Sequence, residues 1–177
     1  AACGKGRHAI LLAEKGFDVT GIDLSAKNIA EAKSNEQANL SFFVHDMRNL
    51  FRINYFDYIF NFYTSFGYFD SVEQDIKCIK AFATGLKPGG KMIIDFLNVT
   101  TTLQHLVEDE SKQMGDILFN ISKSYADGMI SKKIVVREGK QTFTYHEHVR
   151  ALQLKDFEQY CAAAGLKIID TFGSYTL

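Results

Sequence analysis

The sequence predicts an α/β protein with a doubly wound, mostly parallel, Rossmann-like sheet covered by helices on both faces. Helical and strand-like patterns alternate over residues 1–97, and the strand-like runs are apolar enough to be covered on both faces. The turn Lys87-Pro88-Gly89-Gly90 separates a helical pattern from the next strand-like run. Such alternation is typical of parallel sheets whose helices pack on either side.

The first elements are a helix, a strand and a helix. A helix is expected over residues 6–15, with Gly16 in position for a left-handed C-terminal cap. A strand follows over residues 17–24, and Ser25 can N-cap a helix that continues to Lys33.

Three further strands and one helix continue the alternation. Apolar, β-rich runs predict strands over residues 40–44 and 56–63. Ser71 and Gln74 have the spacing of a capping box and predict a helix, after which a strand is expected over residues 92–97. Ligands of such folds bind beyond the carboxyl ends of the strands, which locates the expected site.

Residues 98–152 differ in pattern from the first half and predict an antiparallel insert. A polar stretch near residues 102–109 is expected to be helical, and Asp-Gly and Glu-Gly pairs separate the strand-like runs that follow. These runs cover residues 117–125, 129–137 and 142–151. Residues 153–177 are expected to return to the core as a helix over 154–164 and a strand over 166–172.

Composition excludes several classes of function. The chain has 177 residues with 46% hydrophobic and 23% charged side chains, which fits one globular domain. A formal charge of -1 does not favour nucleic-acid binding, and no apolar run is long enough to span a membrane. The three cysteines match no zinc pattern, so we expect no metal and a reducing, cytoplasmic location.

The first residues predict a nucleotide-like ligand. Ala2-Cys3-Gly4-Lys5-Gly6 lies directly before the first helix, where small residues let the backbone approach a ligand and free N–H groups can meet a carboxylate or phosphate. The same segment also satisfies the dinucleotide pattern G-x-G-x-x-A, with Asp23 at the distance expected for a ribose contact. These residues alone therefore leave both a nicotinamide cofactor and another nucleoside open.

Two aspartates follow successive strands. Asp23 can accept hydrogen bonds from both ribose hydroxyls, and because Ser25 is available as the helix cap, the ribose role is favoured. Asp46 could hold an exocyclic amine while the thioether of Met47 packs on a purine ring. Considered alone, Asp46 is better explained as part of a surface turn.

Taken in order, these features resemble the class I S-adenosylmethionine-dependent methyltransferases over nearly the whole chain. The matching segments are Ala2 to Gly6, Gly21-Ile22-Asp23-Leu24-Ser25, His45-Asp46-Met47, Phe56 to Asn61 and Lys87 to Gly90. The resemblance implies S-adenosyl-L-methionine as cofactor. It also implies cofactor contacts from Ala2, Cys3, Gly4, Asp23, Leu24, Asp46, Met47 and Phe62.

The resemblance further implies a small-molecule methyl acceptor. The segment from Tyr63 to Phe69 is similar to the loop of members that methylate small molecules, and the antiparallel insert resembles their lid. The family's strand order, 3-2-1-4-5-7-6, implies a first strand before Ala2 and a final strand after Leu177. We therefore expect these two strands to be missing from the sequence; oligomeric state is left open.

Methyl transfer by in-line attack needs few catalytic groups. Aromatic faces suit a sulfonium, which favours Phe62 for the cofactor and Tyr68 for the acceptor pocket. His146 and His148 are candidate general bases; alternation places both on one strand face and Glu147 on the other. An exposed strand face explains this pattern better than a catalytic pair does, and the three side chains do not form a metal site.

Two other functions stay open on the sequence. One is an NAD-dependent oxidoreductase, because of the dinucleotide-like spacing of the first glycines. The other is a catalytically inactive subunit that binds the cofactor but has a closed acceptor pocket.

Overall fold

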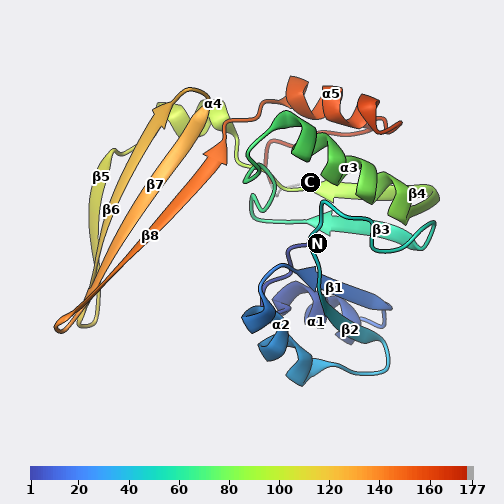
Figure 1. Cartoon of the computed structure of the whole chain (residues 1–177), viewed down its shortest axis with the longest axis horizontal. Coiled ribbons are helices and arrows are strands. Elements are labelled where there is room, and N and C mark those ends of the chain that lie inside the picture. Colours follow the sequence, from blue (N-terminus) through green and yellow to red (C-terminus); the bar gives the residue numbers. More distant parts are fainter. Residues whose placement is uncertain (175–177) are drawn as a thin grey trace. The chain divides into compact units, whose positions relative to one another are not determined.

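The computed structural model describes residues 1–174, which form two compact units (Figure 1). The first unit comprises Ala1–Phe66, Asp70–Phe96 and Glu158–Asp170. The second comprises Gly67–Phe69, Leu97–Phe157 and the described residues after Asp170. Each helix within residues 1–174 is too short or too polar to cross a membrane.

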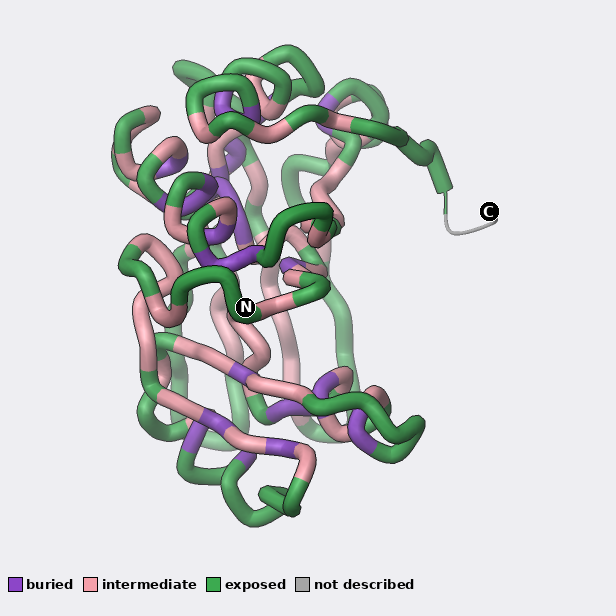
Figure 2. Tube along the Cα trace, turned by 90° about the vertical axis from the view of Figure 1, so that its right-hand side faces the viewer, coloured by how far each residue is buried: buried purple, intermediate pink, exposed green. Residues whose placement is uncertain are grey.

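The first unit begins with a helix–strand–helix–strand segment. Its elements are α1 (Arg7–Glu14), β1 (Val19–Asp23), α2 (Ala26–Ala32), the 3-10 turn η1 (Lys33–Asn35) and β2 (Leu40–Val44). Strands β1 and β2 pair in parallel, as predicted. Buried side chains of α1, α2 and β2 form one cluster, against which Val19 of β1 packs. Its buried members are Ala9, Ala13, Ile29, Ala32, Leu40 and Phe42. Buried residues occur on α1, β1, α2, β2 and α3, and Figure 2 colours the buried parts of the trace purple.

Local signals set the ends of these elements. Gly16 has φ +88°, the left-handed conformation expected after α1. The hydroxyl of Ser25 accepts a hydrogen bond from the Asn28 amide at 3.2 Å, which confirms Ser25 as the N-cap of α2. Asn39 donates from its side-chain amide to the carbonyls of Ala13 and Phe17, each at 2.9 Å, and so holds the end of α1 beside the start of β2.

A second parallel pair completes the sheet elements of this unit. Strand β3 (Phe56–Asn61) pairs with β4 (Leu86–Ile94), and α3 (Val72–Gly85) connects them. The register shifts between Phe56 and Tyr58, opposite the Pro-Gly-Gly segment. The turn predicted at this segment is instead an irregular first part of β4. Strand β4 also ends three residues earlier than the predicted strand at residue 97.

The two parallel pairs are separate two-stranded sheets within the described residues. The first residues of the chain lie between them: the Ala1 amino group donates to the Phe60 carbonyl at 2.6 Å, and the Cys3 amide donates to the Ile22 carbonyl at 2.9 Å. The α/β class and the parallel pairing are therefore confirmed. The strands that the structure describes do not join into one continuous sheet.

The second unit contains the antiparallel sheet predicted for the insert. A short helix, α4 (Val99–Gln104), precedes four strands in the order β5-β6-β7-β8 (Figure 1). Their bounds are Asp109–Met114, Ile117–Ala126, Met129–Glu138 and Gln141–Arg150. The predicted helix near residues 102–109 is wrong at its end, because Asp109 starts β5 and pairs with Ser122 on β6.

The last described segment departs from the prediction in one element. Helix α5 (Leu154–Ala163) is present, and its Tyr160 ring packs 6.5 Å from that of buried Phe66. The predicted strand over residues 166–172 is wrong: no strand forms there. The Leu166 amide instead turns back to the Cys161 carbonyl at 2.8 Å, and without a neighbouring strand a β-rich run has no ladder to join.

Candidate cofactor site

The carboxylate of Asp23 organises the glycine-rich turn. One carboxylate oxygen accepts the Gly4 amide at 2.7 Å, and the other accepts the Ser25 amide at 2.9 Å. Ala2 has φ +52° and Gly4 has φ +56°, so the turn exposes its backbone in left-handed conformations. Since each carboxylate oxygen has two lone pairs and uses one here, Asp23 keeps the capacity to bind two further donors.

Glycine is required at two places in this site because one aromatic ring fills the space that a side chain would need. A Cβ at Gly6 would lie 2.5 Å from the Phe42 ring, and a Cβ at Gly21 would lie 2.4 Å from it. Phe42 is fully buried. The glycine pattern in the sequence therefore has a packing cause, in addition to any role in ligand binding.

Asp46 follows β2 and is held by Arg48. The Arg48 backbone amide and Nε donate to Oδ1 of Asp46 at 2.9 and 3.1 Å. Nε and Nη2 of Arg48 donate to Oδ2 at 3.0 and 2.6 Å. Hydrogen bonds from the guanidinium lower the pKa of the Asp46 carboxyl and raise the pKa of Arg48. Sequence reasoning identified Asp46 and missed Arg48, although the pattern Asp-x-Arg was visible.

Met47 lies between the Asp46 turn and the end of β3. The side-chain amide nitrogen of Asn61 lies 3.6 Å from the Met47 sulfur. Asn61 is fully buried, and among the described residues no donor reaches its side-chain oxygen. A buried polar atom of this kind needs an explanation, and a ligand donor is one. Asn61 was missed as a site residue; its signal was an amide at the end of the apolar run of β3.

An aromatic group follows β3. His8 of α1 lies 5.6 Å from the Phe62 ring and 5.4 Å from the Tyr63 ring, and the Arg7 guanidinium lies 5.5 Å from the Tyr63 ring. Tyr63 has φ +56° and is 65% exposed. Phe62 therefore lies beside the first turn of α1, where the glycine-rich segment ends, whereas Phe66 belongs to the core.

The structure brings the nucleoside-binding candidates together in one unit. The Cys3 amide is hydrogen bonded to Ile22 of β1 and the Gly4 amide to the Asp23 side chain, and the His45 amide donates to the Asp23 carbonyl at 2.9 Å. Leu24 directly follows β1 and is 69% exposed. The carboxyl ends of β1 and β2 are therefore adjacent, with Asp23 opposite Val44 in the register.

The acceptor-side candidates lie in the second unit. His146 and His148 are exposed on one face of β8 with their rings nearly parallel, 6.3 Å apart, and His148 Nδ1 lies 2.9 Å from the Ser131 hydroxyl. Glu147 points to the opposite face and pairs with Lys132 at 3.2 Å. No group of metal-ligating side chains occurs among residues 1–174.

Tyr68 is partly exposed and belongs to the same unit. Its pKa is raised, first by burial of the hydroxyl and then by the negative charge of Glu147. Since Glu147 and the two histidines occupy opposite faces of β8, the carboxylate that acts on Tyr68 is on the other side of the strand from the imidazoles. The structure therefore brings His146 and His148 together on one face of β8.

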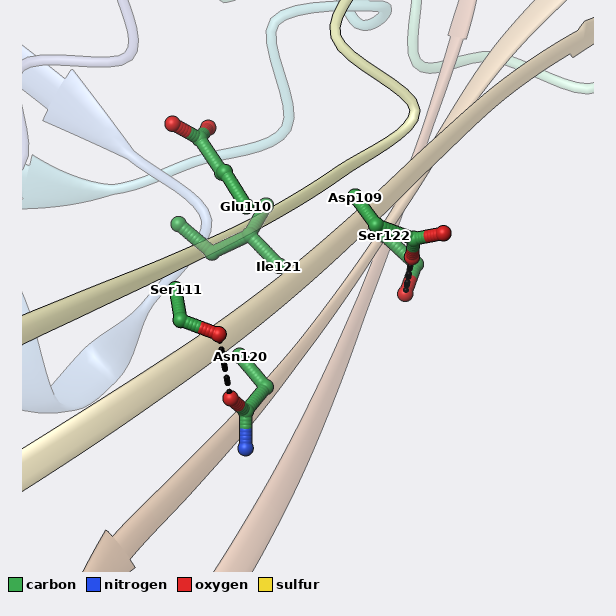
Figure 3. A pocket seen from close by; sticks show the side chains of 6 residues that line it. All are labelled: Asp109, Glu110, Ser111, Asn120, Ile121 and Ser122. Atoms are coloured by element: carbon green, nitrogen blue, oxygen red, sulfur yellow. Dashed lines mark hydrogen bonds between the residues drawn. The ribbon is translucent and has the colours of Figure 1, made fainter.

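A shallow hollow of about 250 Å³ lies on strands β5 and β6 (Figure 3). The Ser111 hydroxyl donates to Asn120 Oδ1 at 2.8 Å, and the Ser122 hydroxyl donates to Asp109 Oδ1 at 2.7 Å. These polar side chains satisfy one another across the two strands. The hollow contains none of the predicted site residues.

Comparison with known proteins identifies the family. A family model described as a methyltransferase domain matches residues 1–90. YqeM of Bacillus subtilis (strain 168) is 36% identical over 97 residues, which cover 53% of this chain and 39% of YqeM. Glycine/sarcosine N-methyltransferase of Halorhodospira halochloris is 27% identical over 182 residues, which cover 99% of this chain and 67% of that enzyme.

Solved structures agree with this assignment. The crystal structure of an S-adenosylmethionine-dependent methyltransferase from Clostridium acetobutylicum ATCC 824 matches with a TM-score of 0.84 and 25% identity, over 96% of this chain and 72% of that one. The CcbJ methyltransferase of Streptomyces caelestis shares the fold, with a TM-score of 0.82 and 17% identity over 96% of this chain and 72% of CcbJ.

The chain spans about two fifths of the length of YqeM and of a Geobacillus relative, 39% and 44% respectively. The family model nevertheless covers half of the chain and includes the glycine-rich turn, Asp23 and Asp46. The chain therefore belongs to the methyltransferase domain family, within the class I S-adenosylmethionine-dependent methyltransferases.

Proposed function

We propose that this chain binds S-adenosyl-L-methionine and transfers its methyl group to a small-molecule acceptor by in-line displacement. The observation that carries the proposal is the position of the Asp23 carboxylate, which accepts the Gly4 amide of the glycine-rich turn at 2.7 Å. The carboxylate that we propose for the ribose and the glycine-rich backbone turn are thereby held together at the end of β1.

The residues present fit this cofactor. Each oxygen of Asp23 accepts one backbone amide and keeps a lone pair for a ribose hydroxyl. The side-chain oxygen of Asn61 is buried, and no donor within residues 1–174 reaches it. We propose that Ala2, Cys3 and Gly4 supply the backbone contacts, Leu24 and Met47 the apolar contacts, Asp46 the adenine amine contact and Phe62 a contact near the sulfonium.

When bound, the cofactor supplies an electrophilic methyl group on a positively charged sulfur. The residues of this chain have to align an acceptor lone pair with that methyl group and exclude water. The Phe62 ring can stabilise the adjacent positive charge through its π face. We propose that Tyr68 lines the acceptor pocket and that His146 or His148 takes a proton when the acceptor is a hydroxyl.

The small-acceptor part of the proposal is supported by the relative from Halorhodospira halochloris, a glycine/sarcosine N-methyltransferase that matches 99% of this chain. It is also supported by the antiparallel sheet within residues 98–152, which we propose as the acceptor-side insert between a core of residues 1–97 and a returning segment of residues 153–177.

Isothermal titration of the full-length protein tests the cofactor. We expect S-adenosylhomocysteine to bind and NADH not to bind; NADH binding alone would favour the NAD-dependent oxidoreductase instead. Asp23→Ala should weaken S-adenosylhomocysteine binding by about 1.5–3 kcal/mol, because hydrogen bonds to a charged group are lost. An unchanged dissociation constant would remove Asp23 from the site.

Activity has to be tested separately. Transfer of a labelled methyl group from S-adenosylmethionine to a panel of small amines, amino acids, sugars and phenols should label at least one compound. Cofactor binding without transfer to any of them would favour the inactive subunit.

A further inference from the structure

We infer that Arg48 is a positioning residue that sets the purine selectivity of this site, by holding the Asp46 carboxylate in one orientation. The inference rests on the proposed function, because it assigns Asp46 to the adenine amine of the cofactor. Arg48 acts through Asp46 and is assigned no contact of its own with the purine or the reacting atoms.

The contacts between the two side chains leave Asp46 little freedom. The guanidinium meets the carboxylate along its edge, with three N–H···O distances between 2.6 and 3.1 Å. The Arg48 backbone amide adds a fourth contact at 2.9 Å. Both side chains are partly shielded, with exposed fractions of 32% for Arg48 and 21% for Asp46. A planar fork in this position fixes the rotation of the carboxylate.

Arg48 is in turn fixed to helix α3. Its Nη1 donates to the side-chain oxygen of Gln74 at 2.6 Å. The predicted capping box therefore forms only in part: Ser71 accepts the Gln74 amide at 3.4 Å, whereas the Gln74 side chain is engaged by Arg48. A second cation, Lys77, joins the same loop to α3 through Asn49 at 2.9 Å, without contacting Asp46.

A fixed carboxylate distinguishes purines by whether the group that faces it donates or accepts a hydrogen bond. An ionised carboxylate only accepts hydrogen bonds, so it can bind the amine of adenine but repels the carbonyl oxygen of hypoxanthine. A carboxylate that can rotate away loses that preference. Arg48 prevents this rotation, because its guanidinium occupies the edge of the carboxylate.

The test compares S-adenosylhomocysteine with S-inosylhomocysteine, which differ at this purine position, by calorimetric titration of the full-length protein. The wild-type protein should prefer the adenosyl ligand at least tenfold, the effect expected for one charge-assisted hydrogen bond. Arg48→Ala should reduce this preference at least threefold. Arg48→Lys should reduce it less, because it keeps the charge but loses the fork.

Lys77→Ala is the matched control, since it removes a cation that links the same loop to α3. It should change both dissociation constants by the same factor and leave the preference intact. If Arg48→Ala behaves in the same way, Arg48 has only a structural role and the inference is overturned. Should Arg48→Ala fail to fold, Arg48→Lys is compared with the wild-type protein instead, using the same ratio of the two dissociation constants. A wild-type protein that binds neither ligand would instead overturn the proposed function and this inference with it.

Discussion

Replacing Gly21 by alanine should destabilise the protein through a clash with one buried ring. A Cβ at this position would lie 2.4 Å from Cδ1 of Phe42, so the ring would have to move by about 0.6 Å to reach 3.0 Å, the shortest separation that real side chains show. Phe42 is fully buried and pairs with Gly21 in the register of β1 and β2, which limits that movement.

Overpacking of this kind costs about 1–3 kcal/mol. Replacing a strand glycine by alanine returns about 0.5–1 kcal/mol of backbone entropy. With an overlap this severe, we expect Gly21→Ala to lower the free energy of unfolding by about 1.5–2.5 kcal/mol. Phe42→Leu removes the outer ring atoms and lets the remaining methyl groups turn away, so it should recover about 1 kcal/mol or more of that loss in the double variant.

Urea unfolding followed by circular dichroism, on the full-length protein and the double-mutant cycle, measures this coupling. Gly16→Ala serves as control, because Gly16 has φ +88° and a Cβ added there would meet no atom within 4 Å. It should destabilise through backbone strain alone, and Phe42→Leu should not rescue it. A coupling energy near zero between positions 21 and 42 would refute the packing explanation for the glycine.

Three further predictions concern single groups. Ser71→Ala should lower the free energy of unfolding by about 1 kcal/mol, because the N-cap of α3 is lost, and an unchanged thermal midpoint would contradict this. Burial raises the pKa of the Cys3 thiol to about 11. At pH 8 its alkylation, measured by peptide mass spectrometry, should therefore be roughly 100-fold slower than that of an ordinary thiol. Equal rates of alkylation would contradict this. The guanidinium of Arg48 lowers the pKa of Asp46 in the folded protein. The ionised carboxylate therefore contributes to the free energy of unfolding above about pH 4, and this contribution is lost as the pH falls toward the pKa of the folded state. Asp46→Asn should therefore flatten the acid side of the stability profile, and an equally steep profile would exclude the ion pair as its cause.

Much of the fold follows from short-range patterns. The strand over residues 40–44 was predicted at its observed bounds, and the hairpins after Asp127 and Glu138 were predicted from the dipeptides that form their turns. Both signals act through neighbours in the chain, so they are readable without knowledge of the tertiary structure. By contrast, β5 was missed because the polar segment Asp109–Met114 becomes a strand only through pairing with β6.

Some residues of the candidate site could likewise be predicted from the sequence, and others could not. Asp23 was predictable, since its strand, the glycine-rich turn and Ser25 follow one another at fixed spacing. Asn61 was not, because its significance comes from burial beside Met47, and a polar residue at a strand end is usually exposed. The sequence also did not separate core aromatic residues from exposed ones after β3. Phe66 is in the core and Tyr63 is exposed, although their sequence context is similar.

The amino-acid sequence by itself determined the α/β class, the parallel pairs, the antiparallel insert and the family resemblance, because helix and strand periods and turn residues act over a few positions. Only the tertiary structure decided that Arg48 holds Asp46 and joins it to Gln74, that one ring of Phe42 imposes glycine at two positions, and that residues 166–172 form no strand. The contact of Arg48 with Gln74, the position of the Phe42 ring and the missing strand all depend on which distant group lies within a few ångströms, because hydrogen bonding and steric exclusion act only at that range.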